Sequence, residues 1–254
     1  MIDAVIPTHN WVKIEMTMMK FGSVALLIAL LNACGGGSSS ATYYGFATTP
    51  INSQRIYSKA IIDNSNNAIN LTVSDTTTAV NPDGSWVELE NDPTNSSVTV
   101  DGTTYSITTE STTRNNSGQA LFLTYTPSGG SLTTCTFAPH GGGPDYPLVA
   151  GKTWSITYTE TCGASAPISY SQTGSVIDIE TVTVPAGTYS TAKLQSTYIW
   201  TDKNGTTHTE TLTNWRDPIT GISVKSDAFF TYSGTALANG YPVTNSVVLQ
   251  SGAL

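Results

Sequence analysis

Short runs in which apolar and polar residues alternate recur along the chain after residue 40. In the run TWSITYTET, Trp154, Ile156 and Tyr158 fall on one face, and only threonine and serine fall on the other. Alternate side chains of a strand point to opposite faces, so this run predicts a strand with one buried and one hydrated face. In SWVELEND, the same rule groups Trp86, Glu88 and Glu90, and we expect this carboxylate face to be hydrated.

Turn signals separate these runs. The clearest is Asp101-Gly102 in VTVDGTTY, because Asp-Gly accepts the positive φ angles of a two-residue hairpin turn. Clusters of proline, glycine, asparagine and aspartate predict longer turns at 81–84, 127–130, 185–187, 202–205 and 217–221. About ten to thirteen short strands with such spacing, and no convincing amphipathic helix, predict an antiparallel sandwich, barrel or open sheet.

Composition narrows the range of partners. Charged residues make up 11% of the chain, and the net charge is −8, whereas about 25% charged residues is typical. An acidic chain without a basic patch is unsuited to binding nucleic acid or anionic lipid by charge. We therefore expect no nucleic-acid partner.

The N-terminal part has the pattern of an export signal. Lys20 precedes the apolar run FGSVALLIALL, which is too short to span a bilayer. Leu31-Asn32-Ala33-Cys34 resembles the lipobox of bacterial lipoproteins, which implies cleavage between Ala33 and Cys34 and lipidation of Cys34. An ordinary signal peptide with a chance cysteine is the alternative. By analogy with this class, Gly35 favours the outer membrane, on its periplasmic or surface side.

These features divide the chain into three parts. Residues 1–33 are expected to be the signal peptide with an N-terminal extension, the true start being Met18 or Met19. Residues 34–42 form a glycine- and serine-rich tether, and 43–254 form one all-β domain, whose two halves meet near residue 140. The partner of the N-terminus is then the membrane, through its lipid.

The two remaining cysteines are Cys135 and Cys162. An exported chain meets oxidising conditions, so the pair is expected to form a disulfide. Metal binding is the alternative, but zinc takes about four ligands and the sequence has no close cysteine pair. We expect no metal and no cofactor.

The second half of the domain resembles a recurrent module of uncharacterised exported bacterial proteins and lipoproteins. The resemblance rests on YPLVAGKTWSITYTET, GSVIDIETVTVPAGTYSTAKLQSTYIW and TNWRDPITGISVKSD. It implies a large curved antiparallel sheet, a half-barrel or open barrel similar to lipoprotein-carrier proteins, with a β-sandwich as the alternative. It also implies turns at Gly151, Gly187 and Gly221 and core positions for Trp154 and Trp215.

Candidate catalytic groups are few. His208 is expected to be an exposed strand residue, and His140 lies in a flexible glycine-rich loop. Asp178 and Glu180 lie two residues apart, about 6.5–7 Å along a strand, and such a pair can serve glycoside hydrolysis. Two acids on a hydrated face are commoner, and Glu88 and Glu90 are interpreted in the same way.

We therefore expect no catalytic residues and no enzymatic activity. The favoured function is a lipid-anchored extracytoplasmic binding or envelope-maintenance module, whose ligand the sequence leaves open between an apolar lipid or lipoprotein and a glycan. The first alternative is a carbohydrate-binding surface module, and the second is a glycan hydrolase with a carboxylate pair. Carbohydrate binding would use the aromatic residues Tyr43, Tyr44, Tyr198, Trp200 and Tyr241.

Overall fold

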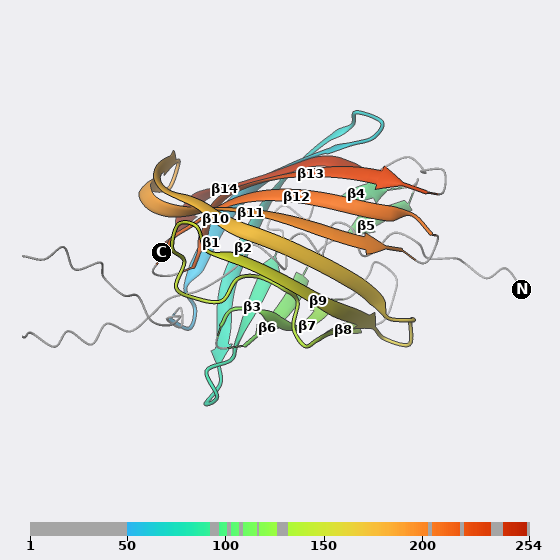
Figure 1. Ribbon diagram of the computed structural model, residues 1–254, viewed down its shortest axis with the longest axis horizontal. Helices are drawn as coiled ribbons and strands as arrows, with labels where there is room; N and C mark the ends of the chain where they lie inside the picture. The colour runs from blue at the N-terminus through green and yellow to red at the C-terminus, as the bar shows by residue number, and fades with distance from the viewer. Residues whose placement is uncertain are drawn as a thin grey trace, which may run out of the picture.

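The computed structural model describes residues 50–91, 97–100, 103–106, 109–115, 117–125, 132–202, 205–218, 221–234 and 241–252. These residues contain strands and no helix (Figure 1). The strands of the first half are β1 (Gln54–Asp63), β2 (Ala68–Val80), β3 (Trp86–Asn91), β4 (Ser97–Val100), β5 (Thr103–Ser106), β6 (Thr109–Arg114), β7 (Ala120–Tyr125) and β8 (Thr133–Ala138). Those of the second half are β9 (Thr153–Cys162), β10 (Ile168–Val184), β11 (Gly187–Thr201), β12 (Thr207–Arg216), β13 (Ser223–Ser233) and β14 (Pro242–Gly252).

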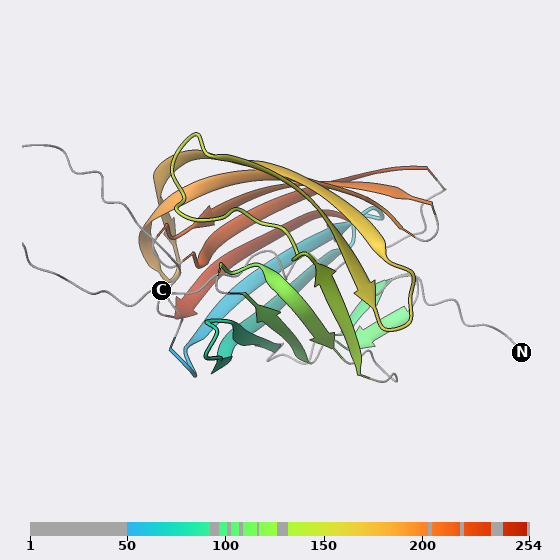
Figure 2. The ribbon, with the colours of Figure 1, turned by 60° about the horizontal axis from the view of Figure 1, so that its bottom comes forward.

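Twelve of the strands form one closed antiparallel barrel in the order β1-β14-β13-β12-β11-β10-β9-β8-β7-β6-β3-β2. Figures 1 and 2 show the strands of the second half of the chain arching over those of the first half. β4 and β5 form a separate antiparallel pair, with Val100 opposite Thr103, whereas the predicted turn residues Asp101 and Gly102 lie outside the described residues. The prediction of an all-β protein with a large curved antiparallel sheet is confirmed.

The sheet closes where its first and last strands meet. β1 pairs with β14, with Tyr57 opposite Leu249 and Lys59 opposite Val247. This pairing removes the free strand edge that an open half-barrel would leave. On the other side of the barrel, β8 pairs with β9, so the strands before and after residue 140 belong to the same sheet.

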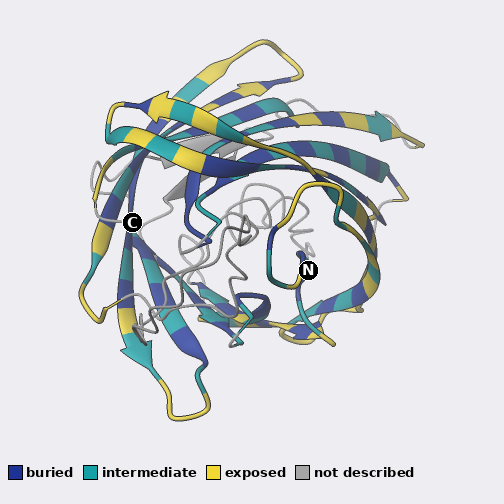
Figure 3. Cartoon of the chain, turned by 60° about the vertical axis from the view of Figure 1, so that its left-hand side comes forward, coloured by how far each residue is buried: buried dark blue, intermediate teal, exposed yellow. Residues whose placement is uncertain are grey.

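The two faces of the wall differ as the alternation predicts. On β9, Tyr158 is buried and Trp154 and Ile156 are half-buried, whereas Ser155 and Thr157 are exposed. Figure 3 shows the barrel as a ring of strands along which buried and exposed residues alternate. Threonine and serine occupy much of the outer face, which explains how a chain with few charges can present a hydrated exterior.

The predicted turn glycines are confirmed by their backbone. Gly151, Gly187 and Gly221 have φ angles of 84°, 145° and 67°, values that glycine adopts without the steric cost of a Cβ. Gly174 has a different role, because a Cβ there would lie 2.2 Å from the Trp154 ring. The ring of Trp154 therefore packs directly over the backbone of β10 and against the cluster of Leu148, Val176, Ala192 and Leu194.

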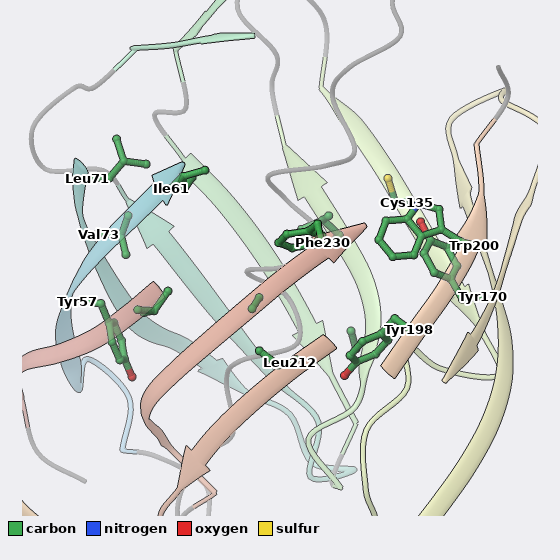
Figure 4. Close-up of a cluster of buried hydrophobic side chains, with 14 of the residues drawn as sticks. Tyr57, Ile61, Leu71, Val73, Cys135, Tyr170, Tyr198, Trp200, Leu212 and Phe230 are labelled. Carbon is green, nitrogen blue, oxygen red and sulfur yellow. The ribbon is translucent and has the colours of Figure 1, made fainter. Parts of the chain in front are cut away.

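The main apolar core lies inside the barrel. Figure 4 shows Tyr57, Ile61, Leu71 and Val73 together on one side of the view and Tyr170, Trp200 and Cys135 on the other, with Phe230 between them. These side chains come from β1, β2, β8, β10, β11 and β13. Among the described residues, no helix has the length and hydropathy needed to cross a bilayer.

Candidate functional site

The inner face of the barrel carries many of the chain's few charged side chains. A buried charge is costly unless it is paired or hydrogen-bonded. The contacts of each charged group therefore indicate whether it stabilises the fold or is available to a ligand. The buried charged residues of the barrel wall are Arg55, Lys59, Asp63, Asp75, Glu88, Glu90, Glu110, Arg114, Glu160, Glu210 and Arg216.

The predicted hydration of the carboxylate face of β3 is wrong. The alternation is correct, since Trp86, Glu88 and Glu90 share one face, but that face points into the barrel and all three residues are buried. Val87 and Leu89 are the half-buried outer residues instead. The cations that make burial of Glu88 tolerable come from β1 and β6, which the alternation within β3 does not reveal.

Glu88 is held between two arginines, and we call Arg55, Glu88 and Arg114 the Glu88 cluster. Arg55 Nη2 donates to Glu88 Oε1 at 2.8 Å, and Arg114 Nε donates to Glu88 Oε2 at 2.7 Å. Arg114 Nη1 also donates to the carbonyl oxygen of Gly118. Such charge-assisted hydrogen bonds are roughly twice as strong as neutral ones, so they offset much of the cost of burial.

Electrostatics within the Glu88 cluster favour the charged form of Arg55. Burial by itself lowers the pKa of Arg55, but the charges of Tyr57, Glu88 and Asp75 outweigh it and raise the pKa above its ordinary value. Asp75 lies directly opposite Arg55 on β2. With Asp75 included, the two guanidinium groups of the Glu88 cluster therefore face two carboxylates within the barrel wall.

Lys59 differs from this pattern. It lies on the same inner face of β1 and is 2% exposed, and its Nζ has no hydrogen-bond partner among the described residues. Leu71 of β2 and Val247 of β14 lie directly opposite it. We call this group the Lys59 strip, and its members are Tyr57, Lys59, Ile61, Leu71 and Val247.

A ladder of aromatic rings lines the other side of the interior. Tyr158 stacks on Tyr170 with ring centroids 4.9 Å apart, and Trp200 stacks on His208 at 5.0 Å. The ring faces of these residues are thus largely used against each other. The ladder comprises Phe137, Tyr158, Tyr170, Trp200, His208, Tyr232 and Tyr241.

The prediction of an exposed His208 is wrong. His208 is 0% exposed and stacks within the aromatic ladder, because it lies on the buried inner face of β12 directly opposite Trp200. Its Nε2 lies 3.3 Å from Asp202 Oδ2. Burial lowers the pKa of His208 to about 4, although the hydrogen bond and charge of Asp202 oppose that shift. The imidazole is therefore neutral at pH 7.

Glu160 is a buried carboxyl beside the aromatic ladder. Tyr170 Oη donates to Glu160 Oε2 at 2.9 Å. Burial raises the pKa of Glu160 to about 7, and the hydrogen bond from Tyr170 only partly opposes the shift. Unlike Glu88, Glu160 has no ion pair with a cation in the described part of the chain.

The disulfide between Cys135 and Cys162 is confirmed. The two residues lie directly opposite each other on β8 and β9, with an S–S distance of 2.05 Å. Glu160 approaches both sulfur atoms closely enough for the three groups to hold a metal ion. Because the sulfurs are bonded to each other, they are not thiolates, and the arrangement does not fit a thiolate metal centre.

The glycine-rich loop after β8 is more ordered than predicted. Gly141 N donates to the carbonyl oxygen of Ala120, and Gly143 N donates to Gln172 Oε1 at 2.7 Å. Gln172 in turn donates to Tyr198 Oη. His140 is half-buried in this loop, and burial lowers its pKa. The loop is held against the inner face of β10 by these bonds, although its sequence is typical of a flexible segment.

Asp178 and Glu180 lie on the outer face of the barrel, as expected. Lys193 pairs with Glu180 at 3.4 Å, and the indole of Trp215 donates to Glu180 Oε1. The hydrogen bond from Trp215, more than the charge of Lys193, lowers the pKa of Glu180. The prediction that Trp215 is a core residue is wrong, because its ring lies outside between Lys193 and Lys225.

The other residues proposed from the sequence have mixed outcomes. Tyr198, Trp200 and Tyr241 are buried inside the barrel rather than displayed as a surface platform. Tyr43 and Tyr44 lie outside the described residues, as do Ala33 and Cys34, the signal peptide and the tether. The lipidation and cleavage sites therefore remain predictions from the sequence.

Sequence reasoning missed Arg55, Lys59 and Arg114. The signal for Lys59 was present in QRIYSKAIID, where the alternation places it on one face with Tyr57 and Ile61. Arg55 and Asp63 lie at the two ends of the same face, and Lys59 is the charged residue between the apolar side chains of that face. The pairing of Arg55 and Arg114 with Glu88 had no comparable signal, because these residues are 33 and 26 positions from Glu88.

Comparisons with known proteins give limited information. No protein-family model matches the chain, and no curated protein matches it. Among solved structures, the hypothetical lipoprotein YmcC from Escherichia coli K12 is 11% identical, with a TM-score of 0.43, over 81% of this chain and 90% of that one.

Two further structures are similar to the same degree. A proposed exported protein with a YmcC-like fold from Bacteroides fragilis is 11% identical with a TM-score of 0.42, over 84% of this chain and all of that one. A proposed lipoprotein from Parabacteroides distasonis is 15% identical with a TM-score of 0.42, over 85% of this chain and all of that one. These scores are too low to transfer function.

Proposed function

We propose that this protein is a lipid-anchored, extracytoplasmic binding module without catalytic activity, and that its ligand binds inside the barrel. The observation that carries this proposal is the inward-facing Lys59, whose buried Nζ has no hydrogen-bond partner among the described residues. Eight-stranded barrels are about filled by their own side chains, whereas larger barrels commonly enclose ligand sites. A barrel of twelve strands belongs to the larger class.

Two observations support an extracytoplasmic location. The Cys135–Cys162 disulfide is of a kind that persists in oxidising compartments. The sequence Leu31-Asn32-Ala33-Cys34, behind an apolar run and ahead of a glycine- and serine-rich segment, resembles a lipoprotein processing site. Two or more acyl chains on Cys34 would anchor the protein stably.

The dispersal of the candidate catalytic groups supports a binding role. His208 is packed in the aromatic ladder, and Asp178 and Glu180 lie on the outer face with Glu180 bound to Trp215. General acid–base catalysis needs such groups within hydrogen-bond reach of one substrate. The positions of these residues on opposite faces of the wall are unsuited to that task.

Carbohydrate binding is less well supported. Sugar rings are usually held by stacking on aromatic faces that are free to receive them, but Tyr170 and Trp200 already use their faces within the ladder. The buried Lys59 strip, in contrast, combines one cation with apolar side chains of the barrel interior. An amphiphilic ligand fits that combination better than a glycan does.

Native mass spectrometry tests the proposal. The full mature chain would be exported behind a non-lipoprotein signal sequence and purified without detergent. We expect an adduct of constant mass, about one per protein, that is released on unfolding. If the protein shows only its own mass, both as isolated and after incubation with lipid and glycan extracts of the envelope, the binding function is contradicted.

The anchor has its own test. In the full-length chain, Cys34→Ser should abolish palmitate labelling and membrane association, because the sulfur that carries the lipid is lost. Cys135→Ser is the matched control, since it removes a cysteine that we expect to carry no lipid. Labelling of the Cys34→Ser protein at the wild-type level would contradict the anchor.

A further inference from the structure

Lys59 is the buried cation for which the described structure offers no partner. Its nearest inner-face neighbours along β1 are Tyr57 and Ile61, and Leu71 and Val247 lie directly opposite. The diagonal neighbours on the adjoining strands are Ile69, Val73, Asn245 and Leu249. None of these eight positions holds a carboxylate. These eight neighbours are therefore apolar, apart from the phenol of Tyr57 and the amide of Asn245. The carboxylate on the same face of β1, Asp63, accepts hydrogen bonds from Ser65 and Asn67 instead.

Such an arrangement is costly for the protein alone. Moving an ammonium group out of water without a compensating anion is unfavourable, and pairing with an anion in a protein interior recovers much of the loss. Arg55, on the same strand face, shows that this fold can supply a carboxylate where one is needed. The missing anion at Lys59 is therefore a sign that a ligand supplies it.

We propose that the ligand is a long-chain fatty acid, with its carboxylate paired to Lys59 Nζ and its acyl chain along the apolar residues of the Lys59 strip. This inference rests on the proposed function, since it places the ligand inside the barrel. Ile61, Leu71 and Val247 belong to a continuous apolar cluster that also contains Phe230. Contact of an acyl chain with such apolar side chains is favourable, and the gain grows with each CH₂ group removed from water.

The charge of the site favours one negative charge on the head group. Arg55 is the other inner-face cation of β1, and it already forms an ion pair with Glu88. A phosphate monoester would bring a second negative charge without a second unpaired cation on this strand. A carboxylate therefore matches Lys59 better than a phosphate does.

Competition binding tests this inference with the full mature chain after delipidation. The probes are palmitate, the neutral analogue hexadecanol and the dianionic analogue hexadecyl phosphate. We expect palmitate to bind at least tenfold more tightly than either analogue. Lys59→Met, which keeps an unbranched side chain of similar size without its charge, should weaken palmitate binding at least tenfold and leave hexadecanol binding unchanged.

Two control variants complete the design. Lys59→Arg should retain most palmitate affinity, and Lys225→Met, which removes a lysine from the outer face, should retain all of it. A melting curve checks that each variant is folded. Wild-type palmitate affinity in a folded Lys59→Met protein would overturn the inference, as would equal binding of palmitate and hexadecanol.

The outcome is separable from a failure of the proposed function. If native mass spectrometry finds an adduct but Lys59→Met binds palmitate like the wild type, only the fatty-acid assignment fails. If neither an adduct nor binding of any probe is found, the proposed binding function fails with it.

Discussion

The Glu88 cluster and the Lys59 strip are two regions of one inner surface. The buried cations are paired with a carboxylate in the first, whereas the buried cation of the second has no partner among the described residues. Both include a cation of β1 that is almost fully buried. Arg55 reaches Glu88 at 2.8 Å, and Arg114 completes the cluster from β6. Lys59, four residues further on, faces Leu71 and Val247.

This difference separates a structural role from a binding role. Removing one partner of a buried ion pair leaves an uncompensated charge and is strongly destabilising. For a buried charge that has no partner, we expect the opposite. Its removal should stabilise the fold, because the charge no longer has to be kept out of water. Stability measurements can therefore distinguish the two regions without knowledge of the ligand.

The largest effect is expected in the Glu88 cluster. Glu88→Gln should lower the free energy of unfolding by about 3–5 kcal/mol, because two buried guanidinium groups lose their shared anion. Chemical denaturation measures the change. The matched control is Glu180→Gln on the outer face, which should leave stability almost unchanged. Equal effects of the two substitutions would refute the structural role of the cluster.

Loss of the disulfide should have a slightly smaller effect. The bond closes a loop with a sequence separation of 27, for which chain entropy gives about 3–4 kcal/mol. The Cys135→Ala/Cys162→Ala protein should be less stable by that amount but bind palmitate normally, since the pair lies on β8 and β9, away from the Lys59 strip. Loss of palmitate binding in a folded double variant would contradict the separation of the two regions.

Glu160 offers a comparison with Glu88 as a buried carboxyl without a cation. Its pKa of about 7 in the folded protein lies above the ordinary 4.5, so its contribution to stability is complete below pH 4.5 and is lost as the pH rises through 7. Glu160→Gln does not titrate. The free energy of unfolding of the Glu160→Gln protein, relative to that of the wild type, should therefore rise by about 2–3 kcal/mol between pH 4.5 and 8.

The difference between the wild type and the Glu160→Gln protein reports the Glu160 carboxyl alone, although His208 changes the stability of both proteins in the opposite direction with pH. The pKa of His208 is lowered to about 4, so its contribution is present above pH 6.5 and is lost as the pH falls. That contribution is the same in both proteins and cancels in the difference. Denaturation midpoints measured at several pH values would give the curve, and a flat difference would contradict a raised pKa for Glu160.

The smallest change in stability is expected for Lys59→Met, and its sign should be opposite to that of Glu88→Gln. Without ligand, Lys59→Met should raise the free energy of unfolding by about 1–2 kcal/mol, because it removes an unpartnered polar group from an apolar environment. Saturating palmitate should reverse the order of stability, since it stabilises only the protein that binds it well. A destabilised, ligand-free Lys59→Met protein would indicate that Lys59 has a structural role.

The sequence predicts the strands and their alternation well, because both depend on local residue patterns. Trp154 and Tyr158 face inward as expected, and Gly187 forms the predicted turn. The alternation also groups Glu88 with Glu90 correctly. It does not decide which face of β3 is the interior, because that depends on Arg55 and Arg114 in distant segments.

The candidate site was harder to predict for a similar reason. The threonines that flank His208 predict a hydrated strand, but barrel closure encloses the face that it shares with Leu212. Closure itself depends on the pairing of β1 with β14, about 190 residues apart in sequence, as in the bond from Gln250 to Ser58. Short-range patterns carry no signal for such a contact, so the sequence did not distinguish a closed barrel from an open sheet.

The most direct test of the central claim is a crystal structure of the mature protein with 16-bromohexadecanoic acid. We expect the carboxylate within hydrogen-bond distance of Lys59 Nζ, and the anomalous signal of bromine should place the chain terminus inside the barrel, against the apolar residues around Ile61, Leu71 and Val247. A fatty acid bound with its carboxylate away from Lys59, or bound only on the outer face, would contradict the account.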